Sequence, residues 1–240
     1  MISRILYEDN HLLVFNKFPG EIVQGDKTGD VPLVDLLKEY IKEKYNKPGN
    51  VFLGVVHRID RPASGAVLFA RTGKALGRLN EMLREGSMKK VYWAIVKNRP
   101  PQESGHLIHY LKKNEEKNKA FVYDHEAGGS KRAELEYRLL GSGDQYHLLE
   151  ILLLTGRHHQ IRAQLAAIGC PIKGDVKYGF PRTNQDGSIH LHARSVEFLH
   201  PVSKEIIRIE APPPADKLWE HFSTMAAGNQ RPEGKEILSG

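Results

Sequence analysis

The sequence has little cysteine and no long hydrophobic run. Its one cysteine, Cys170, excludes an internal disulfide framework and a cysteine-rich zinc site. No apolar stretch approaches the roughly 18 residues that a membrane-spanning helix needs. The N-terminal residues enter a strand-like pattern at once, without the charged, apolar and cleavage regions of a secretory signal. Together these absences predict a cytoplasmic protein without a membrane partner.

Motifs that would identify a bound nucleotide or a serine nucleophile are also missing. There is no G-x-G-x-x-G after a first strand and no G-x-x-x-x-G-K-[ST], so a nucleotide-phosphate cradle is not expected. A G-x-S-x-G elbow is absent as well. His158 and His159 are adjacent, and on a helix they would point about 100° apart, which excludes a shared metal ion. We therefore expect neither a cofactor nor a metal.

The charge balance points to an anionic partner. The chain of 240 residues carries 35 Lys and Arg against 29 Asp and Glu, a formal net charge of +6. Such a balance favours polyanions, and nucleic acid heads that group. The hydrophobic content of 40% is ordinary for a globular protein, and the length is sufficient for one large core.

The apolar periodicity predicts an α+β fold. Near-3.6 spacing indicates helices at 33–47, 74–85 and 158–168, the last with Thr155 as its N-cap. Strand-like runs lie at 4–8, 12–17, 51–56, 66–70, 89–96, 105–111, 119–124, 132–140, 146–154, 189–198 and 206–210. Short connections between neighbouring runs favour a mixed, largely antiparallel central sheet with flanking helices.

The chain shows no linker that would divide its body. We expect one domain over residues 1–222 and a flexible C-terminal tail over 223–240, because residues 226–240 carry Gly, Pro and charge without an apolar period. No segment suggests an association helix, so a monomer is expected.

The most informative stretch is 51–72, where two apolar runs flank a short polar insert. Asp60 lies in this insert between Arg58 and Arg61. One interpretation makes Asp60 a turn residue that caps backbone N–H groups. The other makes it a carboxylate that neighbouring guanidinium groups keep ionised, ready to act as a nucleophile or general base. The segment alone leaves both open.

Several longer motifs resemble those of one family. The segment 57–60, HRID, with Ser64-Gly65 resembles the H-R-L-D-x-x-x-S-G signature of the RluA-type pseudouridine synthases. Three further segments are similar to other motifs of that family, in the expected order: N-K before P-G at 16–20, K-x-Y-x-A at 90–94, and TGRHHQIR with the following G-x-P-I-x-G-D at 155–175. The likeness runs from about Tyr7 to Pro212.

The sequence also departs from the family pattern. Phe18 separates Lys17 from Pro19, Ile59 and Ala63 replace the commoner Leu and Thr, and residues 22–25 replace the usual V-H-P. No S4-like RNA-binding domain is expected before Arg4.

The resemblance implies an isomerase that converts specific uridines of ribosomal or transfer RNA to pseudouridine without a cofactor. It implies Asp60 as the catalytic carboxylate, Arg162 as its salt-bridge partner and Tyr92 as the ring that stacks on the base. Without the motif, Tyr92 would be a core residue of its strand and Arg162 a surface residue. Whether Asp60 acts at C1′, at C6 or through a glycal stays open.

The resemblance also implies a set of RNA-binding side chains. Arg58 would fill the space that the flipped uridine leaves, and Ile161 would form an apolar wall of the uracil pocket. The other expected substrate-binding residues are His57, Arg157, His159 and Gln160.

Two other function classes fit parts of the pattern. A non-catalytic RNA-binding or ribosome-assembly module could keep the same scaffold. A carboxylate glycosidase would need a second acidic residue facing Asp60.

Overall fold

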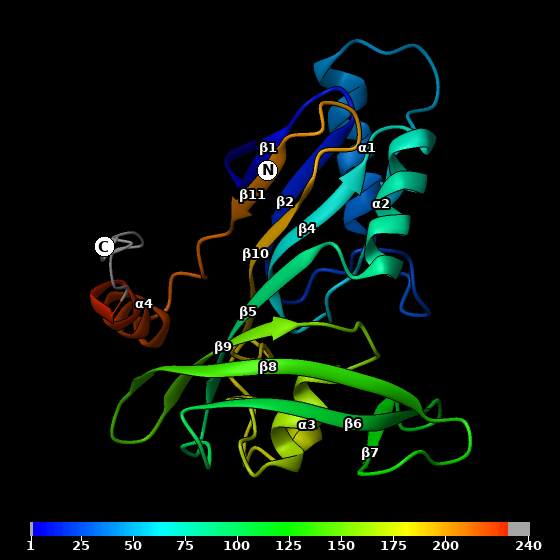
Figure 1. The fold of residues 1–240 in the computed structure, drawn as a ribbon. Coiled ribbons are helices and arrows are strands. Elements are labelled where there is room, and N and C mark those ends of the chain that lie inside the picture. Colours follow the sequence, from blue (N-terminus) through cyan, green and yellow to red (C-terminus); the bar gives the residue numbers. More distant parts are fainter. Residues whose placement is uncertain (1, 230–240) are drawn as a thin grey trace, which may run out of the picture.

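A single mixed sheet of eleven strands forms the centre of the molecule (Figure 1). The computed structural model describes residues 2–229. The strands are β1 (Ile5–Glu8), β2 (Leu12–Lys17), β3 (Gly54–Val55), β4 (Ser64–Ala70), β5 (Lys89–Val96), β6 (Ser104–Asn114), β7 (Lys119–Tyr123), β8 (Lys131–Ser142), β9 (His147–Leu153), β10 (Leu191–Leu199) and β11 (Ile206–Glu210). The helices are α1 (Leu33–Lys44), α2 (Gly73–Glu85), α3 (Gln160–Ala167) and α4 (Lys217–Asn229), with short 3-10 turns at Ile2–Arg4 and Val176–Tyr178.

The strand order is β1-β2-β4-β10-β5-β9-β8-β6-β7, with β11 added to β10 and β3 added to β4. Every pair is antiparallel except β4 with β10, where Ser64 and Gly65 lie beside His192 and Ala193. The predicted class, a largely antiparallel mixed sheet with helices beside it, is therefore confirmed.

Alternation along the strands divides the core between the two faces of the sheet. In β2, Leu13 and Phe15 share a cluster with the buried side of α1, while Leu12 and Val14 share another with α2. The first cluster also takes in Ile161 of α3, and α4 packs through a third cluster around Trp93. Tyr92 and Ile161, which line the cleft described below, belong to the first cluster.

The predicted strand at 51–56 is much shorter than expected. Only Gly54–Val55 pairs with β4, because the side chain of His57 takes the next position: its Nε2 accepts a hydrogen bond from the Leu68 N–H at 3.3 Å. On the other side of the insert, β4 begins at Ser64, two residues earlier than predicted. The predicted first helix ends at Lys44, before the left-handed Asn46.

The predicted boundary at 222 is wrong, because it falls inside α4. Phe222 and Ala226 are both buried against the sheet beside Trp93, so residues 223–229 continue an ordered helix rather than a tail. The rest of the predicted tail, 230–240, lies outside the described residues. None of the helices in the described part is long and apolar enough to cross a membrane.

Candidate active site

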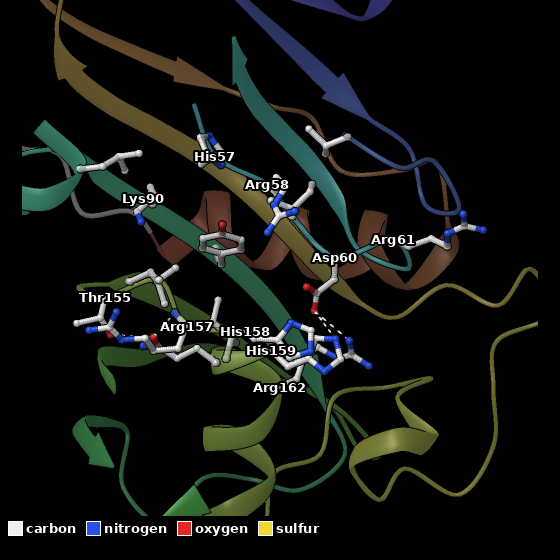
Figure 2. Close-up of a pocket in the computed structure, with 18 of the residues that line it drawn as sticks. His57, Arg58, Asp60, Arg61, Lys90, Thr155, Arg157, His158, His159 and Arg162 are labelled. Atoms are coloured by element: carbon white, nitrogen blue, oxygen red, sulfur yellow. Dashed lines mark hydrogen bonds and ion pairs between the residues drawn. The ribbon is translucent and has the colours of Figure 1, made fainter. Parts of the chain in front are cut away.

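A cleft of about 1280 Å³ opens beside the loop that joins β3 to β4 (Figure 2). Its walls come from this loop, from β5, from the segment between β9 and α3, and from the end of α2. The lining includes eight basic residues against three acidic ones: Arg58, Arg61, Arg84, Lys90, Lys113, Arg157, Arg162 and Lys177 against Asp26, Asp60 and Glu85. Positive charge is thus concentrated in the cleft, although the net charge of the whole chain is only +6.

Asp60 lies in this cleft and forms an ion pair with Arg162. Arg162 Nη1 donates a hydrogen bond to Asp60 Oδ2 at 2.9 Å, and the Asp60 side chain remains 26% exposed (Figure 2). The two residues are 102 positions apart in the chain, so the fold alone brings them together. The predicted salt bridge is present, and Asp60 is open to a ligand.

The two arginines that flank Asp60 in the sequence do not contact it. Arg61 turns away to an ion pair with Asp30 and a hydrogen bond to Thr28. Arg58 makes no side-chain hydrogen bond or ion pair with residues 2–229 and extends into the cleft. The interpretation in which these neighbours hold Asp60 ionised is therefore wrong, because the turn directs their side chains away from the carboxylate.

Asp175 fixes the orientation of Arg162 from behind. Both carboxylate oxygens of Asp175 accept from the Arg162 guanidinium, at 2.7 and 2.8 Å, and both side chains are buried. Burial alone would lower the pKa of Arg162, but the Asp175 and Asp60 carboxylates outweigh it and raise that pKa. Arg162 is thus a permanent cation that bridges a buried carboxylate and an open one.

His159 lies close to the same carboxylate as a neutral ring. The phenol of Tyr178 accepts from the Ala120 N–H, which leaves its own proton to donate to His159 Nδ1 at 3.0 Å. His159 Nε2 then carries the ring proton, 3.7 Å from Asp60 Oδ2. Burial lowers the pKa of His159 to about 3, against the opposing effect of Asp60. The side chain thus presents an N–H to the carboxylate.

The predicted helix at 158–168 begins later, at Gln160. His159 precedes it with a left-handed φ of 52°, and Thr155 does not cap it. Instead the Gln160 amide folds back: its Oε1 accepts from Arg157 N–H at 3.0 Å and its Nε2 donates to Glu134 O at 3.0 Å. The Gln160 side chain therefore shapes the loop before the helix, and this geometry does not support its predicted contact with RNA.

The left-handed turn also changes the two adjacent histidines. The rings of His158 and His159 stack with centroids 3.8 Å apart and planes 21° apart. The expectation of side chains 100° apart is wrong, because neither residue belongs to the helix. Within residues 2–229 no group of three His, Cys, Asp or Glu side chains could hold a metal ion.

The apolar side of the cleft is formed by Tyr92 and Ile161, which are both buried in the main core cluster and line the cleft. Trp93, the next residue of β5, faces the other side of the sheet and packs with α4. Burial raises the pKa of Tyr92, and the Asp60 charge adds to this effect. Its hydroxyl therefore stays protonated beside the carboxylate.

The two remaining predicted residues differ in exposure. Arg157 is exposed at the cleft, and its Nε donates to Arg132 O at 2.9 Å, which leaves the other guanidinium N–H groups open. His57 lines the cleft with a ring whose Nε2 already accepts the Leu68 N–H. Burial lowers the pKa of His57 to about 3, so the neutral ring holds the start of the loop.

Lys17 and Asp175 support the site; both lie in the sequence motifs, but neither was predicted as a site residue. Lys17 is fully buried, and its Nζ donates to the carbonyls of Phe18, Arg61 and Ala63, at 2.9, 3.0 and 2.7 Å. It thereby holds the loop that carries Asp60. Burial lowers the pKa of Lys17 to about 7. The signal that could have identified Lys17 is a charged residue at the end of an otherwise apolar strand.

Comparison with known proteins decides the family. A model described as RNA pseudouridylate synthase matches residues 11–167 of this chain. The chain belongs to the RNA pseudouridylate synthase family. The family assignment that the sequence motifs predicted is thus confirmed, and the family is one of isomerases that act on RNA.

Two similar relatives carry the name ribosomal large subunit pseudouridine synthase C. The protein of Buchnera aphidicola (subsp. Acyrthosiphon pisum) is 34% identical over 219 residues, which cover 88% of this chain and 68% of that protein. The protein of Vibrio cholerae is 34% identical over 214 residues, which cover 87% of this chain and 65% of that protein. The chain thus spans about two thirds of the length of these pseudouridine synthases.

Solved structures confirm the pseudouridine synthase fold. The human RNA pseudouridylate synthase domain containing 4 superposes with a TM-score of 0.75 at 22% identity, over 94% of each chain. The human domain containing 1 gives a TM-score of 0.67 at 21% identity, over 91% of this chain and 86% of the other.

Proposed function

We propose that this protein isomerises uridine in RNA to pseudouridine with Asp60 as the catalytic carboxylate. The observation that carries the proposal is the ion pair of Asp60 with Arg162 in an open, basic cleft. A planar guanidinium that is itself anchored by Asp175 orients the Asp60 carboxylate in the cleft. Such a group can attack a sugar carbon, add to the base or remove a sugar proton.

The reaction breaks the bond between uracil N1 and ribose C1′ and forms a bond between C5 and C1′. The proton at C5 leaves to solvent and another is taken up at N1, so no oxidant, reductant or cofactor is required. We assign Tyr92 to stacking on the uracil and to proton transfer at C5, and Ile161 to the apolar wall beside it. The position of Tyr92 in the cleft lining supports the stacking role; to take the C5 proton the phenol would first have to pass its own proton to solvent, since burial and the Asp60 charge keep it protonated.

RNA is the polyanion that fits the cleft. The excess of Lys and Arg along its lining attracts phosphates, and a flipped base enters the pocket at a cost of a few kcal/mol. Arg58, which has no protein partner among the described residues, is the side chain that would replace the flipped base in the helix. The names of the relatives favour ribosomal RNA of the large subunit as the substrate, with transfer RNA as the alternative.

The geometry argues against the glycosidase alternative. The nearest second carboxylate to the Asp60–Arg162 pair is Asp175, which is 1% exposed and has both oxygens bound to Arg162. It is not part of the cleft lining, so it cannot serve as the facing acid that a glycosidase needs. The retained ion pair likewise favours an enzyme over a non-catalytic RNA-binding module.

We further propose that the chain works as a monomer in the cytoplasm and that the catalytic domain extends to the end of α4. Packing of Phe222 and Ala226 against the sheet supports this boundary.

Release of tritium from RNA that carries 5-tritiated uridine tests the proposed reaction. Asp60→Asn is expected to abolish release while RNA binding and thermal stability are kept, because the amide is nearly isosteric but cannot act as a carboxylate. Asp124→Asn, at a carboxylate that is 94% exposed outside the cleft, serves as the matched control and keeps full release. Substantial release by Asp60→Asn would refute the catalytic role.

A further inference from the structure

Lys90 occupies the cleft beside Tyr92 without a function assigned to it so far. The two residues are separated by one position on β5, so their side chains emerge on the same face of the sheet. Both line the cleft, and Figure 2 shows the Lys90 side chain among the residues that surround the cleft. The Lys90 ammonium lies close to Gly156, 3.7 Å from where a Cβ at that position would be.

The ammonium of Lys90 is an unpaired cation in a partly buried place. It makes no hydrogen bond and no ion pair with any residue of the described range 2–229, and burial lowers its pKa. The preceding residue, Lys89, is the contrast: it lies on the other face, is 66% exposed and forms an ion pair with Glu197 at 2.8 Å. A partly desolvated charge without a counter-ion is costly, and an arriving anion removes that cost.

Among residues 2–229, no carboxylate pairs with Lys90 to fill this role. His57, whose lowered pKa keeps its ring neutral, lies near enough to feel the Lys90 charge. Of the acidic residues in the lining, Asp60 is engaged by Arg162, and neither Asp26 nor Glu85 pairs with Lys90. Gly156 contributes no side chain, so only its backbone approaches the ammonium there.

We propose that Lys90, beside the position Gly156 that carries no side chain, binds one backbone phosphate of the RNA next to the target uridine. This inference rests on the proposed function, since it places a phosphate of the same strand beside Tyr92. A lysine ammonium suits a phosphate oxygen as a compact point charge, and the contact positions the strand without reading its sequence. Lys90 is thus a substrate-positioning residue on the strand that also presents the stacking ring.

The first experiment compares Lys90→Met with the matched control Lys89→Met. Binding to a short fluorescent oligouridylate is measured over a series of salt concentrations, and thermal stability is measured in parallel. For Lys90→Met we expect roughly tenfold weaker binding at low salt and a slope of log affinity against log salt that is smaller by about 0.7. Because an uncompensated charge is removed, the melting temperature should stay the same or rise. Lys89→Met should leave the affinity and the slope unchanged.

The second experiment introduces a carboxylate next to Lys90 by mutation. Gly156→Asp places a carboxylate in front of Lys90, and Gly156→Asn places a neutral side chain of the same size there. We expect the Asp variant to bind oligouridylate more weakly and to melt at a higher temperature than the Asn variant. In a Lys90→Met background the stability difference between the two should vanish, because the cation that pairs with the carboxylate is gone.

Three outcomes would overturn the inference. The first is a slope of log affinity against log salt that is the same in Lys90→Met as in the wild type. The second is weaker binding by Lys90→Met that is accompanied by a lower melting temperature. The third is a stability difference between Gly156→Asp and Gly156→Asn that is the same with Lys90 and with Lys90→Met. These outcomes are separable from the catalytic proposal. If the wild-type protein releases tritium but the slope does not depend on Lys90, only the phosphate site fails. If the slope depends on Lys90 but the wild-type protein releases no tritium, only the proposed reaction fails.

Discussion

Arg162 is held by Asp175 through two parallel hydrogen bonds, from Nε at 2.7 Å and from Nη2 at 2.8 Å. The remaining terminal nitrogen, Nη1, donates to Asp60. Because a guanidinium is planar and rigid, its orientation toward Asp60 is set from the buried side. Asp175 therefore acts on the candidate reaction through Arg162, without touching the substrate.

We expect Asp175→Asn to lower kcat for tritium release by about tenfold or more, with a much smaller effect on KM, because second carboxylates of this kind orient the group that touches the substrate. Loss of one partner from the buried pair should also reduce the free energy of unfolding, by about 3–5 kcal/mol. Tritium release at several RNA concentrations and chemical denaturation provide the two measurements. Asp186→Asn, in an exposed loop nearby, is the control. An unchanged kcat in Asp175→Asn would show that Arg162 needs no second anchor.

Gly65 permits the close approach of β4 to β10. Its φ is +116°, and a Cβ there would lie 2.3 Å from the carbonyl oxygen of Ala193. We therefore expect Gly65→Ala to reduce the free energy of unfolding by at least about 2 kcal/mol and to lower tritium release, since β4 begins directly after the Asp60 loop.

The matched control is Gly73→Ala at the first residue of α2, where a Cβ would meet nothing within 4 Å. This substitution should leave stability within about 1 kcal/mol of the parent, or improve it, because alanine restricts the unfolded chain. Denaturant unfolding of both variants measures the difference. Equal stabilities would mean that β4 and β10 can move apart at no cost.

Three buried histidines and the partly buried His57 predict a loss of stability in mild acid. Burial lowers the pKa of His57 and His159 to about 3 and of His190 and His192 to about 4. Their ordinary value is 6.5, so between pH 6.5 and about 4 the unfolded chain binds protons that the folded chain excludes. Stability should be unaffected by these groups above pH 6.5 and fall as the pH drops through this window, by up to about 1.4 kcal/mol per pH unit for each histidine.

Melting temperatures across this pH range measure the effect. His192→Gln should flatten the decline, whereas His125→Gln, at an exposed position, should not change its slope. The comparison uses the change of melting temperature with pH, so it remains valid even if His192→Gln has a lower melting temperature at every pH. A parent protein whose stability is constant from pH 7 to 4 would contradict the prediction.

Much of the architecture could be predicted because apolar periodicity is a local signal. The runs that became β2, β5, β9 and β11 alternate or are continuously apolar, and they fold close to their predicted bounds. The failures lie where a side chain replaces a backbone partner. His57 ends β3 by accepting a ladder hydrogen bond, and Gln160 replaces the expected N-cap Thr155 by folding back on its own loop. Secondary-structure propensity depends on the local sequence and does not report such side-chain contacts.

In the candidate site too, some residues could be identified from the sequence, whereas other contacts are seen only in the folded chain. Motif resemblance identified Asp60 and Arg162, whose contact spans 102 positions, but local charge suggested Arg58 and Arg61 as the partners of Asp60. Only the folded chain shows that Arg61 turns to Asp30 and that Asp175 stands behind Arg162. The end of the domain was misplaced because Trp219, Phe222 and Ala226, which pack α4 beside Trp93, were not recognised as one face of a helix.

The parallel pairing of Ser64 with His192 has a consequence for how the protein matures in the cell. During synthesis, the Asp60 loop emerges long before the strand that completes its frame, and Arg162 and Asp175 also follow more than 100 positions later. Many seconds therefore pass between synthesis of the early hairpin and synthesis of the distant strand that pairs beside it. A ribosome-bound fragment that stops short of β10 should therefore be inert, and activity should appear only once that strand has been released.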